Sequence, residues 1–225
     1  AEASHVLIQL PGIVSNDPIV IEDDGHGMKE QELRQEYLNI ANPRLSRKGD
    51  RTPNLNRLVK GRRGIGKFAG LVLADVMEVV TRAGGVETSL IVDRRQLQNG
   101  DVDIETVPLS ISTKPCEKHR HGTTVVLREL NPRLSYPSEE ALSETLSYDY
   151  GKEISIEIMI NGKRVNNYNV QGKTFSQQVD IGNNQFAEVK YTIADKPLPP
   201  RKAGLILREG NKAIGRPCFF GLELN

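Results

Sequence analysis

Short apolar runs separated by turn-forming residues open the chain. Residues 5–10 and 18–22 are rich in Val and Ile and are separated by Pro, Gly and Asn, which predicts two strands joined by a turn. In residues 29–40 the apolar side chains recur at the spacing of one helical face, which predicts a helix. The apolar run 64–75, which opens with glycines, predicts a second helix.

The rest of the chain favours strands. The pattern predicts strands over 76–82, 86–93, 123–129, 154–160, 186–193 and 204–209, and a helix over 138–147. Turns are signalled by Gly84-Gly85, by Asn161-Gly162 and by Gly210-Asn211. Because strands and helices interleave, the predicted fold class is α+β: a two-layer α/β sandwich with a mixed, mostly antiparallel sheet covered by helices on one face.

Composition narrows the class of protein. Of 225 residues, 37% are hydrophobic and 26% charged, with a net charge of +1, which is typical of a globular domain that does not enter a membrane. The only two cysteines, Cys116 and Cys218, exclude a disulfide scaffold and favour a cytoplasmic location. The absence of Trp argues against a stacking platform for single-stranded nucleic acid.

Residues 41–63 form a long polar segment with one acid, Asp50. Loops of this length in compact domains are usually functional. Its basic residues are Arg44, Arg47, Lys48, Arg51, Arg57, Lys60, Arg62 and Arg63. They are candidates for contacting phosphates or nucleic acid, and a solvated loop is the alternative interpretation.

Three glycine-containing clusters are candidates for a binding site. The first runs from Asp23 to Met28, the second from Gly61 to Phe68, and the third is Gly122-Thr123. Any one of them alone is also consistent with a plain turn.

The first cluster suits a purine. Asp23 ends an apolar strand, and a buried carboxylate needs hydrogen-bond donors, which an adenine amino group supplies. Gly25 and Gly27 let the backbone approach a flat base, and Met28 offers a soft apolar surface to it. Asp24 is interpreted as a solvated turn residue.

The other two clusters suit phosphates and the base. Gly64, Ile65 and Gly66 are predicted to present backbone amides at a helix N-terminus, where phosphate oxygens bind. Lys67 adds a charge there or is a plain surface lysine. In the third cluster Thr123 offers a hydroxyl near Asp23, and Gly122 leaves room beside the base.

In order and spacing, these clusters resemble the motifs of the GHKL ATPase superfamily, which includes DNA gyrase B, the ninety-kilodalton heat-shock chaperones, histidine kinases and MutL. The DxGxG box corresponds to Asp23, Gly25 and Gly27, followed by Met28. The GxxGxG box corresponds to Gly61, Gly64 and Gly66, with Arg62, Arg63, Ile65, Lys67 and Phe68 in or beside it, and the GT box to Gly122 and Thr123. The run 64–82 looks most like the chaperone branch and its bacterial relatives.

The resemblance implies a Bergerat ATP-binding fold over residues 1–150, with a mobile lid at about 40–63. It implies ATP and Mg²⁺ as ligands. Residues 151–225 are then a β-rich segment that begins a transducer-like domain. Nucleotide binding is expected to close the lid and to drive a conformational change or homodimerisation of a larger protein. The alternatives are a sensor histidine kinase domain and a catalytically incomplete module that binds nucleic acid through residues 44–63.

One feature of the superfamily is missing. Its members begin with a helix that carries a water-activating Glu and a Mg²⁺-binding Asn, and these are expected to precede Ala1 in a longer protein. Glu2 stands too close to the first strand for the catalytic role. The sequence therefore assigns no catalytic residue to this chain and places ATP hydrolysis in the intact protein. A zinc site at Cys116, His119 and His121 is a weaker alternative, because no fourth ligand is evident.

Overall fold

The computed structural model describes residues 2–12, 15–38, 49, 51–57, 66–97, 109–150, 156–166, 170–198, 203–209, 212–219 and 221. The chain divides into two compact units, which are described separately. The first comprises Ala1–Glu140 and Ser155–Arg164, and the second comprises Ala141–Ile154 and Val165–Asn225.

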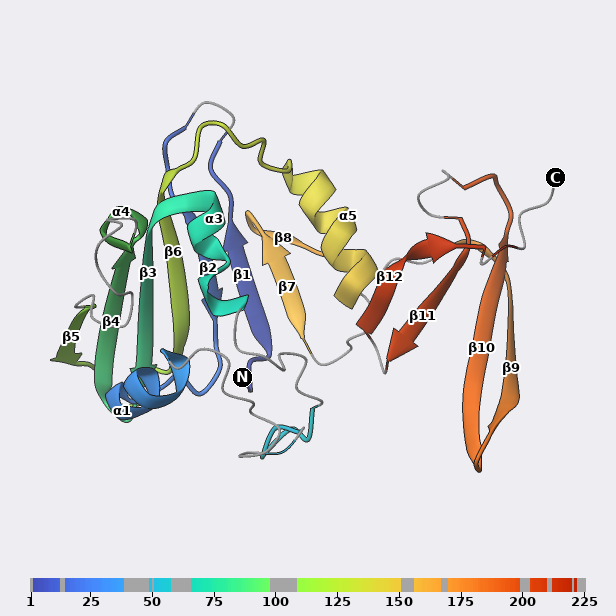
Figure 1. Ribbon diagram of the computed structural model, residues 1–225, viewed down its shortest axis with the longest axis horizontal. Coiled ribbons are helices and arrows are strands. Elements are labelled where there is room, and N and C mark those ends of the chain that lie inside the picture. Colours follow the sequence, from blue (N-terminus) through green and yellow to red (C-terminus); the bar gives the residue numbers. More distant parts are fainter. Residues whose placement is uncertain are drawn as a thin grey trace. The chain divides into compact units, whose positions relative to one another are not determined.

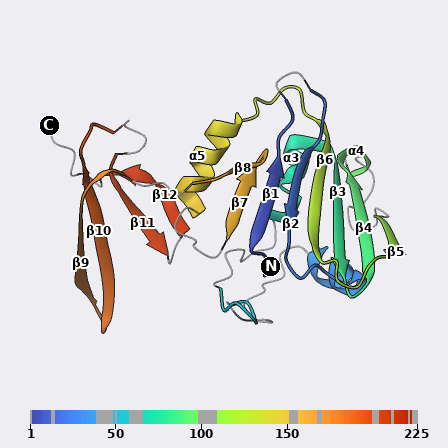
Figure 2. The same cartoon turned by 180° about the vertical axis from the view of Figure 1, so that it is seen from behind.

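A mixed sheet forms the first unit (Figures 1 and 2). In spatial order its described strands are β5 (Ser110–Pro115), β4 (Val86–Asp93), β3 (Ala74–Ala83), β6 (Gly122–Leu130), β2 (Ile19–Asp23), β1 (His5–Gln9), β7 (Glu157–Ile160) and β8 (Lys163–Arg164). β1 and β7 run parallel, and the other neighbouring pairs are antiparallel. The predicted mixed, mostly antiparallel sheet is confirmed.

Short helices lie on one face of this sheet. α1 (Glu30–Glu32) continues directly into the π-helical turn η1 (Leu33–Tyr37), and Figures 1 and 2 show α1 on the same side of the sheet as α3 (Gly70–Leu73). The 3₁₀ turn η2 (Gly66–Phe68) precedes α3, and α4 (Arg94–Leu97) follows β4. The prediction of a continuous helix over 64–75 is wrong at its C-terminal end, because β3 already begins at Ala74.

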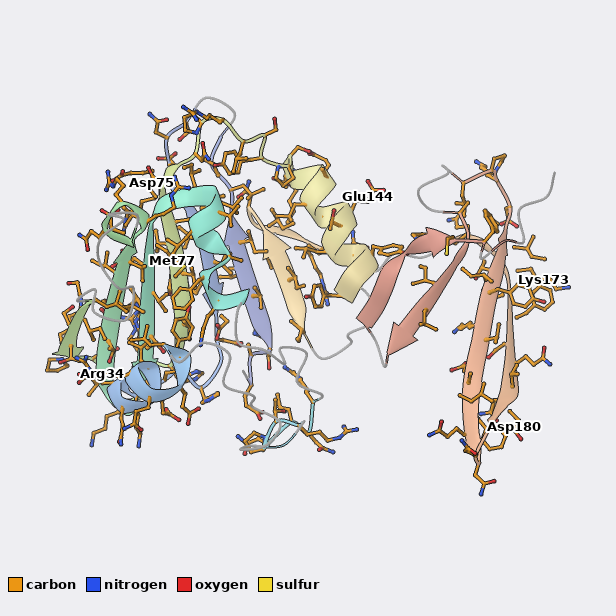
Figure 3. The ribbon with its side chains drawn as sticks, viewed as in Figure 1. Arg34, Asp75, Met77, Glu144, Lys173 and Asp180 are labelled. Carbon is orange, nitrogen blue, oxygen red and sulfur yellow. The ribbon has the colours of Figure 1, made fainter. Side chains whose placement is uncertain are left out.

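Alternation along the central strands builds the core between sheet and helices. On β3 the side chains of Met77, Val79 and Thr81 are completely buried, as is Leu33 of η1. Figure 3 labels Met77. The buried cluster consists of Ile19, Leu33, Ala74, Met77, Val79, Leu90, Val92 and Leu127. The apolar faces of β2, β3, β4 and β6 therefore form the core beneath the helices, as the two-residue period predicts.

Two predicted turns are confirmed by their backbone angles. Gly84 and Gly85 join β3 to β4 with φ of 64° and 85°. Asn161 and Gly162 join β7 to β8 with φ of 47° and 82°. Such positive angles favour Gly and Asn, which explains why these dipeptides signal turns.

The second unit contains most of α5 (Glu139–Tyr150) and two hairpins. β9 (Gly172–Gly182) pairs with β10 (Gln185–Ala194), and β11 (Leu205–Glu209) pairs with β12 (Lys212–Cys218). The predicted turn at Gly210-Asn211 lies outside the described residues. Among the helices that the structure describes, none combines the length and apolarity needed to cross a membrane.

Candidate nucleotide-binding site

Strand register places Asp23 in one row with two threonines. Asp23 is the last residue of β2 and lies opposite Thr123 of β6, which in turn lies opposite Thr81 of β3. Directly opposed residues of neighbouring strands point to the same face of a sheet. Asp23, Thr123 and Thr81 therefore form a polar row on the helix-covered face, at one end of the buried strands.

The carboxyl group of Asp23 is half-buried. Burial raises its pKa, while hydrogen bonds from the backbone of Gly25 and Thr123 act in the opposite direction. The bond from the Gly25 N–H to Oδ1 measures 2.8 Å. A further donor, such as an exocyclic amine of a ligand, would favour the ionised form in this environment.

The loop after β2 is packed tightly against neighbouring strands through two glycines. Gly27 has a φ of 66°, and a Cβ atom there would lie 1.9 Å from the carbonyl oxygen of Arg82. Gly122 has a φ of 115°, and its Cβ would lie 2.1 Å from the carbonyl oxygen of Asp23. Both positions therefore need glycine for conformation and for space.

Thr81 holds this loop in place and was missed by the sequence prediction. Its Oγ1 accepts a hydrogen bond of 2.7 Å from the N–H of Met28 and lies 3.4 Å from both Gly122 O and Thr123 Oγ1. Thr81 thus connects β3 and β6 to the loop that follows β2. The available signal was a threonine at a buried, otherwise apolar position of an alternating strand.

A Thr81→Val variant should lose stability while keeping its shape. The change leaves the Met28 N–H without its acceptor, which costs about 1–3 kcal/mol for a buried donor. Urea denaturation measures this loss. Thr113→Val is the matched control, because Thr113 is an exposed threonine on β5. If both variants unfolded at the same urea concentration, the bond from Met28 to Thr81 would contribute nothing to the loop.

His121 has a contact that the sequence prediction did not foresee. Its Nδ1 lies 2.8 Å from the carbonyl oxygen of Gly25, so His121 contacts the same loop. Among the described residues no group of three or more His, Cys, Asp or Glu side chains is placed to hold a metal ion.

Asp24, interpreted from the sequence as a solvated turn residue, keeps a side chain that is 38% exposed, but its carboxylate also has a structural role. Its carboxylate accepts hydrogen bonds from the backbone of Ser4 and His5 and contacts the His5 ring, at 2.6 to 2.8 Å. Partial burial acts to raise the pKa of Asp24, but these hydrogen bonds outweigh it and lower that pKa. Asp24 therefore ties the loop to the start of β1.

The described part of the second box packs against η1. The rings of Phe68 and Tyr37 pack edge-on, with their centroids 6.1 Å apart. Burial raises the pKa of Tyr37 to about 12. Lys67 Nζ lies 5.5 Å from the Tyr37 ring centroid and 3.4 Å from the carbonyl oxygen of Glu36. Gly66 opens η2 with nothing within 4 Å of a Cβ placed on it. The other candidates of this box, Gly61, Arg62, Arg63, Gly64 and Ile65, lie outside the described residues.

Residues 51–57, the main described part of the predicted lid, contact the start of the chain. The Glu2 carboxylate accepts hydrogen bonds of 3.0 Å from the N–H groups of Asn54 and Leu55, and Arg57 donates to the carbonyl oxygen of Ala3. Desolvation acts to raise the pKa of Glu2, but hydrogen bonds from Asn54, Thr52 and Leu55 outweigh it and lower that pKa. Glu2 therefore stabilises a turn.

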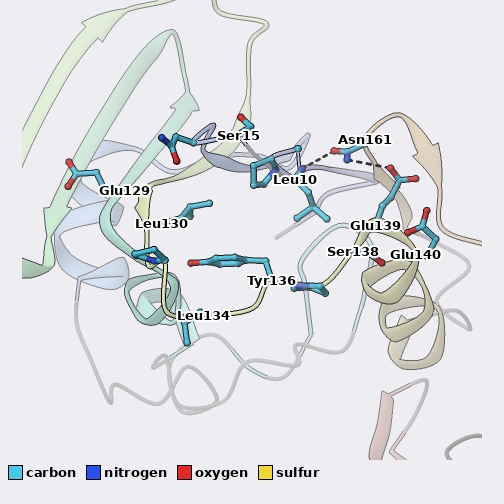
Figure 4. Close-up of a pocket in the computed structure, with 15 residues that line it drawn as sticks. Leu10, Ser15, Glu129, Leu130, Leu134, Tyr136, Ser138, Glu139, Glu140 and Asn161 are labelled. Atoms are coloured by element: carbon cyan, nitrogen blue, oxygen red, sulfur yellow. Dashed lines mark hydrogen bonds between the residues drawn. The ribbon is translucent and has the colours of Figure 1, made fainter.

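A hollow of about 870 Å³ lies at the opposite end of the strands from Asp23 (Figure 4). None of the predicted site residues lines it. Asn161 accepts a hydrogen bond from the Leu10 N–H at 2.8 Å, and Glu139 pairs with Lys163 at 2.8 Å. These polar groups join the β7–β8 turn to β1 and α5, so we assign them a structural role.

Comparison with known proteins identifies the same ATPase family as the three glycine-containing motifs. Residues 1–123 match the profile of the histidine kinase-, DNA gyrase B-, and HSP90-like ATPases. The chain is 25% identical over 170 residues to a putative type II restriction enzyme, HgiDII, of Herpetosiphon aurantiacus, covering 74% of this chain and 27% of that protein. It is 26% identical over 133 residues to the chaperone protein HtpG of Mesorhizobium japonicum, covering 57% of this chain and 20% of that protein.

A second HtpG, from Vibrio campbellii, is 25% identical over 150 residues, covering 65% of this chain and 22% of that protein. The chain thus spans between 20% and 27% of the length of these relatives. The family match includes the first two boxes and ends at the GT box, covering more than half of the 225 residues. The chain therefore belongs to the family of histidine kinase-, DNA gyrase B-, and HSP90-like ATPases.

Proposed function

We propose that this chain binds ATP through Asp23, Thr123 and the glycine loop beside them, which the buried Thr81 holds in place. Asp23 accepts a hydrogen bond from the adenine amino group, and Met28 packs on the base. The observation that carries the proposal is the half-buried carboxyl group of Asp23, which lies beside the Thr123 backbone within the region that matches the ATPase family.

Phosphate binding is assigned to the second box. We propose that Gly61 to Phe68 contact the phosphates through backbone amides, with Arg62 and Arg63 supplying charge. Lys67 is the weaker phosphate ligand, because its ammonium group already lies beside the Tyr37 ring and the Glu36 carbonyl group. Residues 40–63 act as the lid that closes over the nucleotide.

In a longer protein, lid closure would drive a conformational change or homodimerisation, as in a chaperone-like ATPase. The HtpG relatives favour this assignment over a sensor histidine kinase. A nucleic-acid-binding module is less well supported, because two of the basic side chains it would use already donate hydrogen bonds within the chain. Arg51 donates to the carbonyl oxygen of Asn56, and Arg57 donates to that of Ala3. A cytoplasmic location fits this function.

No residue of this chain is assigned to water activation. Glu2 is held by the turn at Asn54 and Leu55, which leaves it a structural role. Mg²⁺ is the metal that accompanies ATP in such enzymes. Since the described residues contain no metal-ligand group of their own, no step of the proposal depends on the ion.

Thermal unfolding with added nucleotide tests the proposal. At ATP concentrations about a hundredfold above Kd, binding to the native state adds about 2.7 kcal/mol, which should raise the midpoint by about 5–10 °C in a domain of this size. ADP should act similarly and UTP should not, because uracil has no exocyclic amino group to donate to Asp23. An unchanged midpoint at millimolar ATP, supported by calorimetry, would exclude ATP as the ligand.

A further inference from the structure

The hairpin β9–β10 has one apolar face and one polar face. Cross-strand pairs such as Phe175–Tyr191 and Val179–Ala187 fall on the same face. The apolar side chains on this face are Phe175, Val179, Ile181, Ala187, Val189, Tyr191 and Ile193, and Lys173 and Gln177 of β9 share the face with them. Ile181 and Ile193 are 61% and 60% exposed there, so the described residues of the second unit leave this face largely uncovered.

The outer edge of β10 is also open. Within the described residues, β10 pairs with β9 and with no other strand, so one row of its backbone N–H and C=O groups lacks a sheet partner. A two-stranded hairpin alone is only marginally stable in water, and a third strand stabilises it. Figure 3 labels Lys173 and Asp180, near the two ends of β9.

The sequence of β10 is complementary to itself when two copies run antiparallel. If Val189 lies opposite Val189 of the second copy, with the two-fold axis midway between them, Glu188 of each copy lies opposite Lys190 of the other, on the polar face. Ala187 then lies opposite Tyr191 on the apolar face. Opposite charges and apolar pairs in directly opposed positions stabilise a sheet.

The same register gives the exposed side chain of Phe186 a partner. This residue is 65% exposed and is the one large apolar side chain on the polar face of the described hairpin. In the two-fold pairing it lies opposite Thr192 of the second copy, which is a favourable aromatic and β-branched pair.

The edge of β9 offers no such pairing. Its only charged residues are Lys173 and Asp180, which lie on opposite faces of the hairpin. A two-fold antiparallel pairing sets only residues of the same face opposite one another. Charge complementarity is therefore specific to β10.

We propose that two copies of this chain associate through the outer edge of β10, forming a four-stranded sheet about a two-fold axis at Val189. This association goes beyond the proposed ATP binding and needs no nucleotide. Failure of the ATP-binding proposal can therefore be distinguished from failure of this one, because ATP binding is measured by thermal unfolding and association by molecular mass.

Charge reversal and mixing test the pairing. In Glu188→Lys, a lysine at position 188 of each copy lies opposite Lys190 of the other copy, on both sides of the Val189 pair. In Lys190→Glu, a glutamate at position 190 lies opposite Glu188 in the same way. Each variant alone should bind itself at least about tenfold more weakly than the wild-type chain in nucleotide-free sedimentation equilibrium. An equimolar mixture of the two variants should restore the dimer, because every opposed pair is again of opposite charge.

Lys173→Glu on β9 is the matched control and should leave the dimer intact. Restoration by mixing also shows that both variants are folded. A wild-type chain that stays monomeric, a mixture that stays monomeric, or an association that appears only with ATP would each overturn the proposal.

Discussion

Replacing Asp23 by Asn is expected to weaken ATP binding by about a hundredfold. A hydrogen bond to a charged acceptor contributes about 1.5–3 kcal/mol, and the amide nitrogen of the new side chain would in addition set one donor against another. Isothermal calorimetry with ATP measures the loss directly. Wild-type affinity should also fall on acidification, beginning at a higher pH than for an ordinary Asp, because burial raises the pKa of Asp23.

The same substitution should not destabilise the unliganded protein at neutral pH. A carboxyl group whose pKa is higher in the folded than in the unfolded state costs stability when it is ionised, and that cost is absent when both states are protonated. The amide introduced by Asp23→Asn would carry no charge at any pH. The melting temperature of this variant should therefore equal or exceed that of the wild type near pH 7, and the difference should shrink in acid. Unchanged ATP affinity in a folded variant would show that Asp23 is not the base-binding residue.

The local requirements of the candidate site are visible in the sequence, whereas its long-range contacts are not. The need for glycine at positions 27 and 122 arises from backbone angle and close approach, which a glycine-rich motif reveals directly. Thr81 acquires its role only because β3 and β6 pair in a particular register, 42 residues apart at Thr81 and Thr123. His121 likewise reaches Gly25 across 96 residues.

The strands could be predicted from the sequence where a segment is rich in apolar residues. β4 follows its predicted range, and β3 extends its predicted range by a few residues, because β3 is rich in Val and β4 in Val, Leu and Ile, and both flank the turn Gly84-Gly85. β5 and β9 were missed, since Ser, Thr, Lys and Gln dominate both and give little periodic signal. The apolar run after Gly66 could be taken as one helix, but the sheet includes it from Ala74 onward because β6 pairs with it there.

A Gly27→Ala variant is expected to lose most of the stability that the loop after β2 contributes, at least about 3 kcal/mol. The left-handed backbone costs an alanine about 1–2 kcal/mol, and the new Cβ would meet the carbonyl oxygen of Arg82 at 1.9 Å. Because that oxygen belongs to the backbone of β3, it cannot rotate away. The loop must move instead, which breaks the bond from Met28 to Thr81 and separates the base-binding groups.

Gly12→Ala is the matched control for this change. Gly12 lies outside the proposed binding site and has no positive φ, and a Cβ there would meet the Ser15 Cβ at 3.7 Å, an ordinary van der Waals contact. Alanine at such a position restricts the unfolded chain and stabilises the protein by up to about 1 kcal/mol. Urea denaturation should therefore give a much lower midpoint for Gly27→Ala and an unchanged or higher midpoint for Gly12→Ala.

Calorimetry under conditions where both glycine variants are folded should show ATP binding lost in Gly27→Ala and kept in Gly12→Ala. The first change displaces the loop that carries the base contacts, whereas the second lies at the other end of β1. Equal urea midpoints would mean that the loop does not approach β3 as closely as the two backbones indicate, and the base-binding geometry proposed at Asp23 would lose its support.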